Sequence, residues 1–223
     1  MKKGLTEMAF ILDMSGSMSG LVEDTIGGYN SLIEKQKEED GEAYVSTVLF
    51  DDRYIMLHDH INIKDIKPLT NEDYRPRGMT ALLDAIGKTV NSIGVRLNDT
   101  PEEERPEKVI IVITTDGQEN SSREFTKAKI KEMIEHQQSK YNWVFMFLGA
   151  NIDAVGEAGS LGINIDFART YTASNWGTQS VYNSVSTAMS YARGVSSHAE
   201  GNSTISKGSE TYDAMVAALD EIE

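Results

Sequence analysis

Apolar residues gather in three short runs along the chain, and within each run they occupy consecutive rather than alternate positions. Runs of this kind, rich in β-branched or aromatic residues and ended by turn residues, are typical of buried strands in a parallel sheet. We therefore predict strands at residues 8–12, 109–113 and 143–148.

A fourth β-type segment, residues 43–50, continues across Asp51 and Asp52 into residues 53–58. Two such runs joined by a short polar turn predict a hairpin. The hairpin places one antiparallel strand at or near an edge of the sheet.

Between the strands, apolar residues recur at helical spacing. The segments with this pattern are residues 21–38, 81–97 and 125–137. Strands that alternate with helices of this length indicate right-handed βαβ units. The expected fold class is α/β: a doubly wound, mostly parallel sheet with one antiparallel edge strand and helices on both faces.

The pattern changes after residue 148. We interpret residues 1–223 as a single domain, with a core at about 5–170 and a C-terminal part at 171–223. For this later part we predict a short helix at 152–160, a last short strand at 163–167, a helix at 176–193, a Ser/Gly-rich loop at 194–208 and a final helix at 212–222.

Composition narrows the classes of partner. The chain has 35 acidic and 21 basic residues, a net charge of −14, so its surface repels phosphate backbones and we expect no nucleic-acid partner. It has no cysteine, which excludes disulfides and thiolate metal sites and fits a reducing compartment. The apolar run near the N-terminus is too short for a membrane span or a secretion signal. We therefore expect a cytoplasmic protein with no membrane association.

The first predicted strand leads directly into a loop of small residues, Asp-Met-Ser-Gly-Ser-Met-Ser-Gly at residues 13–20. Such a loop, at the carboxyl end of a parallel strand and before a helix, is where doubly wound sheets place ligand sites. The loop lacks the lysine of a P-loop and the glycine spacing of a dinucleotide-binding turn. It also lacks G-x-S-x-G, because Met18 stands where the serine should be.

The loop offers oxygen ligands at alternate positions: Asp13, Ser15 and Ser17. A carboxylate with two hydroxyls suits a hard cation such as Mg²⁺ or Mn²⁺. Because one loop supplies too few oxygens, other strand ends must contribute. The candidates are Thr80, at the start of the second long helix, and Asp116, in the Thr-Thr-Asp-Gly segment that follows residues 109–113.

The order of these segments resembles a known family. Asp13-x-Ser15-x-Ser17, a Gly-x-Thr ending at Thr80, and Thr-Asp-Gly around Asp116 are similar to the metal-ion-dependent adhesion site (MIDAS) of von Willebrand factor type A domains. The similarity covers residues 5–148 and, more loosely, the whole chain. Gly-Met-Thr departs slightly from the family's common Gly-Gly-Thr.

The resemblance implies a role for each position. Ser15 and Ser17 would coordinate the cation directly, Asp13 would hold it through water, and Thr80 and Asp116 would bind directly or through water. Mg²⁺, Mn²⁺ and Ca²⁺ all fit these ligands. An acidic side chain of another protein would complete the coordination.

The resemblance also bears on partners and catalysis. Proteins of this family in bacteria work beside ATPases and other multicomponent systems, so the expected partner is a separate protein, such as an ATPase. The loops contain no evident catalytic base or strong nucleophile, and we expect a binding module rather than an enzyme.

Two other functions compete with this hypothesis. A Mg²⁺-dependent phosphohydrolase of the haloacid-dehalogenase type also begins with an aspartate after its first strand, but Ser15 occupies the position of its second acid. A structural scaffold with an empty site is the other, in which Asp13 and the serines serve only as turn and helix-cap residues.

Several residues beside the metal loop have open interpretations. Met14 and Met18 form an apolar rim where a partner docks, or they pack into the core. Arg77 pairs with acidic groups of the partner, or it is a solvated loop residue. The sequence His58-Asp59-His60 places two imidazoles on one strand face, but no third zinc ligand has clear spacing, and a solvated hairpin is the better interpretation.

Overall fold

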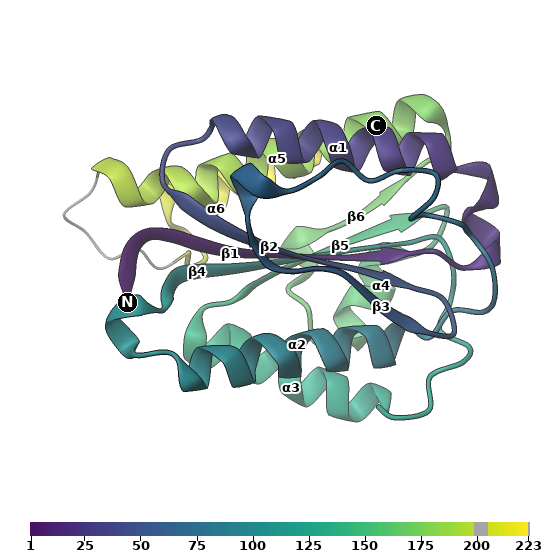
Figure 1. Cartoon of the computed structure of the whole chain (residues 1–223), viewed down its shortest axis with the longest axis horizontal. Coiled ribbons are helices and arrows are strands. Elements are labelled where there is room, and N and C mark those ends of the chain that lie inside the picture. The colour runs from purple at the N-terminus through teal and green to yellow at the C-terminus, as the bar shows by residue number, and fades with distance from the viewer. Residues whose placement is uncertain (199–204, 223) are drawn as a thin grey trace.

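A six-stranded sheet forms the centre of the molecule, in the order β3-β2-β1-β4-β5-β6 (Figure 1). β3 is antiparallel to β2, and all other neighbouring strands are parallel. The computed structural model describes residues 1–198 and 205–222. The strands are β1 (Lys2–Asp13), β2 (Glu42–Phe50), β3 (Tyr54–Asn62), β4 (Pro106–Thr115), β5 (Val144–Ala150) and β6 (Ala168–Tyr171).

Helices cover both faces of the sheet, with α1, α5 and α6 on one face and α2 and α3 on the other (Figure 1). This arrangement confirms the predicted fold class, including the antiparallel edge strand. The helices are α1 (Val22–Glu38), α2 (Leu82–Asp99), α3 (Lys127–Tyr141), α4 (Ala154–Ser160), α5 (Asn175–His198) and α6 (Glu210–Asp220).

β1 shows why both faces need helices. Its side chains alternate: Met8, Phe10 and Leu12 belong to the apolar cluster under α1, α5 and α6, while Ala9 and Ile11 belong to the cluster under α2, α3 and α4. All five side chains are fully buried. Burying a large apolar side chain contributes about 1.5–3 kcal/mol, so a strand that is apolar throughout is stable only between two helical layers.

The strand register aligns the loops at one edge. Asp13 pairs with Phe50, and Leu12 pairs with Thr114. The carboxyl ends of β1, β2 and β4 therefore lie side by side. We call this side of the sheet, together with the loops that follow β1 and β4 and the loop that precedes α2, the carboxyl edge.

The predicted last strand at 163–167 is wrong. Residues Ile165–Phe167 form a short 3-10 helix, and the strand begins only at Ala168, which pairs with Phe147 of β5. Asn164 causes the turn, because its side chain accepts a hydrogen bond from the backbone N–H of Asp166 at 3.1 Å.

The predicted loop at 194–208 differs from the structure at its start. α5 continues through His198, four residues beyond Gly194. Residues 199–204 lie outside the described part of the chain.

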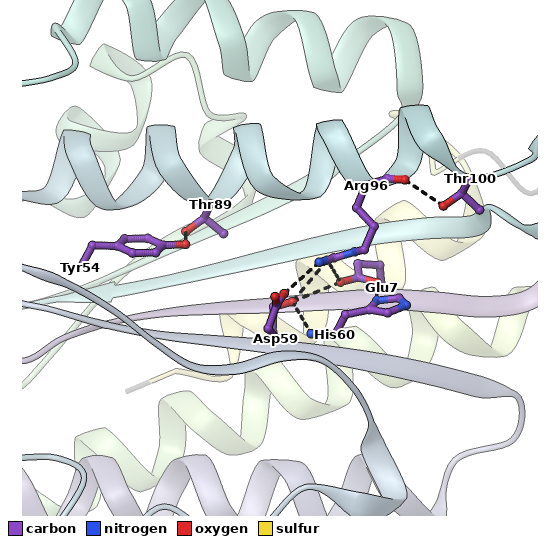
Figure 2. Close-up of polar contacts among 8 residues, drawn as sticks. Glu7, Tyr54, Asp59, His60, Thr89, Arg96 and Thr100 are labelled. Atoms are coloured by element: carbon purple, nitrogen blue, oxygen red, sulfur yellow. Dashed lines mark hydrogen bonds and ion pairs between the residues drawn. The ribbon is translucent and has the colours of Figure 1, made fainter.

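A charged cluster joins α2 to the sheet, as Figure 2 shows. Glu7 of β1 is 1% exposed and accepts a hydrogen bond from Arg96 of α2 at 2.7 Å. Arg96 also donates to Asp59 at 2.9 Å, and the ring of His60 lies 2.8 Å from the other oxygen of Glu7. These contacts pair the buried charge of Glu7, which would otherwise oppose folding.

The two histidines of the hairpin have separate neighbours. His58 lies 3.1 Å from the hydroxyl of Thr47, whereas His60 contacts Glu7. Within residues 1–198 and 205–222, no group of three or more histidine, cysteine, aspartate and glutamate side chains is placed to hold a metal. His58 thus contacts β2, and His60 contacts β1. In the described part of the chain, no helix is long and apolar enough to cross a membrane.

Candidate metal centre

Three loops meet at the carboxyl edge, following β1, preceding α2 and following β4. They carry the five predicted ligands. Because β1 and β4 are adjacent and parallel, residues that follow them emerge together.

Hydroxyl and carboxylate oxygens from two of these loops form a continuous chain. The Ser15 and Ser17 hydroxyl oxygens are 3.0 Å apart, and Ser17 donates a hydrogen bond of 2.6 Å to Asp116 Oδ1. The structure thus brings together Ser15, Ser17 and Asp116, although 99 residues separate the last two.

Thr80, in the loop that precedes α2, lies close to these oxygens. A Cβ atom on Gly117 would lie 3.0 Å from the Thr80 hydroxyl and 3.6 Å from the Ser17 hydroxyl. The two hydroxyls therefore both lie close to Gly117, and a side chain there would crowd them.

Asp13 fixes the loop after β1 through hydrogen bonds made in the core. Its carboxylate accepts one hydrogen bond from the Ser15 backbone N–H at 2.7 Å and another from the Thr115 hydroxyl at 2.5 Å. Its backbone carbonyl accepts from the Tyr74 hydroxyl. Asp13 is fully buried, while Ser17 is exposed, so the oxygens lead from the core to the surface.

The electrostatics favour a cation. Burial raises the pKa of Asp13 from 3.8 to about 6, despite hydrogen bonds from Thr115 and Ser15 that lower it. Burial also raises the pKa of Asp116, against the hydrogen bond from Ser17. Neither carboxylate forms an ion pair with a lysine or arginine in the described residues. Two desolvated carboxylates without a basic partner form an environment that a divalent cation would stabilise.

The surrounding backbone fixes these loops. Thr80 donates its N–H to the Asn120 side chain at 2.9 Å and accepts from the Asn120 N–H at 3.0 Å. Gly16 donates to the Gly78 carbonyl at 3.2 Å. Gly78 has a φ of 68°, which glycine adopts without strain.

This set of side chains fits a hard cation. Three hydroxyls and two carboxylates supply oxygen only, which is the chemistry preferred by Mg²⁺, Mn²⁺ and Ca²⁺. With one oxygen from each of the five side chains, a six-coordinate sphere keeps room for water or an outside ligand.

The interpretation of Met14 and Met18 as an exposed rim is wrong. Met14 is 1% exposed and Met18 is 0% exposed, and both pack into the cluster under α1 and α5, because the short 3-10 helix at Gly16–Gly20 turns Met18 inward. The exposed methionine of this edge is Met79, at 51%. The sequence signal for this exposed methionine was its position between Gly78 and Thr80, where the family commonly has glycine.

Arg77 and several supporting residues lie around the candidate ligands. Arg77 is exposed, and its Nε atom donates to Asp51 at 3.0 Å. Sequence reasoning missed three residues that orient the loops: Asp51, Thr115 and Asn120. Thr115 belongs to the Thr-Asp-Gly motif, although the resemblance assigns it no role, whereas Asp51 and Asn120 carry no recognisable motif.

Comparison with known proteins agrees with this geometry at the level of fold. No family model matches the chain. Inter-alpha-trypsin inhibitor heavy chain H3 from Rattus norvegicus is 26% identical over 136 residues, which span 58% of this chain but only 15% of the rat protein.

Solved structures extend the comparison. Proximal thread matrix protein 1 from the mussel byssus, in a form with a zinc-occupied MIDAS motif, superposes with a TM-score of 0.55 at 19% identity over 82% of this chain and 45% of its own. Manganese-loaded TRAP protein from Plasmodium vivax gives a TM-score of 0.52 at 16% identity over 78% and 70%. A von Willebrand factor type A protein from Catenulispora acidiphila gives 0.55 at 12% identity over 86% and 42%. The chain spans less than half of two of these proteins.

These superpositions extend over 78–86% of the chain. The chain has the fold of a von Willebrand factor type A domain.

Proposed function

We propose that the chain is a protein-binding module that holds a divalent cation at the carboxyl edge. The observation that carries this proposal is the continuous chain of oxygens from Ser15 through Ser17 to Asp116, closed by Thr80. The cation is Mg²⁺, Mn²⁺ or Ca²⁺, since all three accept these ligands.

Each side chain has a distinct task in this proposal. Ser15, Ser17 and Thr80 present hydroxyl oxygens, while Asp116 supplies charge at the surface. Asp13 is too deep to reach a partner and orients the loop through Ser15 and Thr115. When bound, the cation supplies an open coordination position that attracts a carboxylate of the partner protein. The partner is a separate protein that presents an acidic residue, such as an ATPase or another component of a bacterial system.

The burial of Asp13 also bears on the competing phosphohydrolase. A nucleophilic aspartate must reach the phosphorus atom of its substrate. Asp13 is 0% exposed, and both of its carboxylate oxygens already accept hydrogen bonds. This environment supports an orienting role rather than attack on a substrate.

A thermal-unfolding titration tests the metal site. After chelation, the protein is titrated with Mg²⁺, Mn²⁺ and Ca²⁺, and so is the double variant Asp13→Ala/Ser15→Ala. A ligand that binds only the folded state adds about 2.7 kcal/mol at 100 times its Kd. We expect this gain in the wild type and in the control Asp99→Ala/Ser139→Ala, whose substitutions are exposed and distant, and no gain in the site variant.

Affinity capture with and without chelator tests the binding role. We expect a partner that is retained only with metal and lost with the Asp13→Ala/Ser15→Ala variant. The proposal is wrong if none of the three metals raises the thermal stability of the wild type in the titration above.

A further inference from the structure

Two arginines are held together beside the candidate metal centre by one buried carboxylate. Asp51, the first residue after β2, is fully buried. It accepts hydrogen bonds from Arg53 Nε at 3.2 Å and Arg53 Nη2 at 2.8 Å, and from Arg77 Nε at 3.0 Å. A single carboxylate therefore fixes two guanidinium groups from separate loops.

Both arginines also face solvent. The side chains of Arg53 and Arg77 are 45% and 54% exposed. Within the described residues, Arg77 uses only its Nε atom in a side-chain hydrogen bond, so its two terminal nitrogens are free to donate outward. A planar guanidinium that is already oriented loses little conformational entropy when it binds a carboxylate.

The backbone places this pair next to the metal loop. Arg77 donates its N–H to the Met14 carbonyl at 2.9 Å, and Gly16 donates to the Gly78 carbonyl at 3.2 Å. Arg77 lies three residues before Thr80, with the half-exposed Met79 between them. The arginine pair and the candidate metal ligands thus share one surface.

The local charge is unusual for this chain. The protein carries a net charge of −14, whereas Arg53 and Arg77 balance Asp51 and Asp52 at this place. Asp52 is exposed and opposes an anion, but Asp51 is buried and its charge is already compensated. The exposed guanidinium edges therefore offer cationic hydrogen-bond donors on the surface of an acidic molecule.

We propose that the Arg53–Arg77 pair binds a second carboxylate of the partner that the metal centre holds by its first. The inference rests on the proposed function and refines it: the partner segment is acidic and carries two carboxylates within reach of one another. The metal provides the strong contact, and the arginine pair selects segments with a second acid.

Short peptides test this specificity directly. The protein is loaded with Mn²⁺, and peptide binding is followed by water-proton relaxation, which falls when a carboxylate displaces metal-bound water. All peptides are acetylated at the N-terminus and amidated at the C-terminus, so that only glutamate side chains supply carboxylates, and one peptide carries a single glutamate between glycines. The others carry two glutamates separated by spacers of increasing glycine number.

We expect at least one spacing to bind about tenfold more tightly than the single-glutamate peptide, because an oriented charge-assisted pair stabilises binding beyond the twofold statistical advantage. Arg77→Gln should reduce this advantage by about threefold or more while single-glutamate binding stays unchanged. Arg53 still pairs with Asp51 in this variant, so the fold is retained, which a thermal melt verifies. Lys140→Gln, in the last turn of α3 at the opposite edge, removes the same charge and should keep the full advantage.

The outcomes separate this inference from the proposed function. If the single-glutamate peptide binds but no spacing gains more than twofold, the inference is wrong and the metal-dependent module stands. The same holds if the advantage survives in Arg77→Gln, or if Lys140→Gln removes it equally. If no peptide changes the Mn²⁺ signal, both the proposed function and the inference are wrong.

Discussion

A single buried carboxylate, Asp84 in the first turn of α2, organises the loop that follows the candidate metal ligand Asp116. Its two oxygens accept three backbone hydrogen bonds of 2.9 Å, from Arg123, Glu124 and Phe125. Burial alone would raise the pKa of Asp84, but these three donors lower it below the ordinary value of 3.8.

We predict that Asp84→Asn lowers the free energy of unfolding by about 2 kcal/mol at pH 7, because the amide cannot accept from all three donors. A carboxyl whose pKa is depressed by folding stabilises the protein above its unfolded pKa, and this contribution is lost as pH falls through the folded pKa. The difference between wild type and variant should therefore be full above about pH 4 and shrink below it. Denaturant unfolding at several pH values measures this difference.

Asp99→Asn is the matched control, since Asp99 is an exposed residue at the end of the same helix. It should change stability by less than about 0.5 kcal/mol. An Asp84→Asn deficit that stays constant down to low pH would show that the hydrogen bonds do not depend on the charge.

Asp84 and Asp51 also show where sequence reasoning ends at this scale. Asp13, Ser15, Ser17, Thr80 and Asp116 stand at strand ends or a helix start, positions that apolar runs and periodicity reveal. Asp84 binds residues about 40 positions away, and Asp51 binds Arg77 26 positions away. Contacts of this range depend on how loops fold back, which no local pattern encodes.

At the scale of elements, the contact between α1 and α5 depends on one glycine. Gly28 lies on the buried side of α1, and a Cβ atom there would stand 2.2–2.9 Å from ring atoms of Tyr182 in α5. Tyr182 is 1% exposed and cannot swing into solvent without leaving the core. Gly27, the next residue, has no heavy atom within 4 Å of its added Cβ.

We predict opposite effects for the same substitution at these two positions. Gly28→Ala should lower the free energy of unfolding by about 1–3 kcal/mol, because it overpacks the interface between the helices. Gly27→Ala should raise it by about 0.5–1 kcal/mol, because alanine is the better helix former. Urea unfolding of both variants measures the difference. Equal gains from the two would contradict the tight packing of α5 on α1.

The elements themselves were largely predictable. Apolar runs predicted β1, β4 and β5, and helical spacing predicted α1, α2 and α3, since each of these signals spans many residues. The strand predicted at 163–167 failed because its apolar residues are few and Asn164 hydrogen-bonds its own backbone two residues on. A short apolar run does not distinguish a strand from a turn of helix.

At the scale of the whole molecule, a bound cation would join three loops that are distant in sequence but adjacent at the carboxyl edge. Unfolding separates these loops and releases the metal. Metal binding must therefore slow the hydrogen exchange of every amide whose opening also breaks the site. The last turns of α2 and α3 lie at the other end of the sheet, away from these loops (Figure 1). They can fray without disturbing the metal ligands.

Amide hydrogen exchange, with and without saturating metal, distinguishes these regions. At 100 times the Kd, we expect Gly16 at the site and Ile111 in the centre of β4 to exchange about 100-fold more slowly, because Gly16 opens only when the site breaks and Ile111 only on global unfolding. Tyr141, the last residue of α3, should exchange at an unchanged rate.

The combination of slowed and unchanged amides shows which parts of the protein open together with the site. Slowing of Gly16 without Ile111 would mean that the core can open while the site stays intact, so the metal would order a loop without stabilising the fold. Slowing of Tyr141 by the same factor would mean that α3 does not fray independently of the carboxyl edge. In Asp13→Ala/Ser15→Ala none of the three amides should respond to metal. The variant lacks the Ser15 hydroxyl and the Asp13 carboxylate that orients its loop, so it does not bind the metal and gains no stability from it.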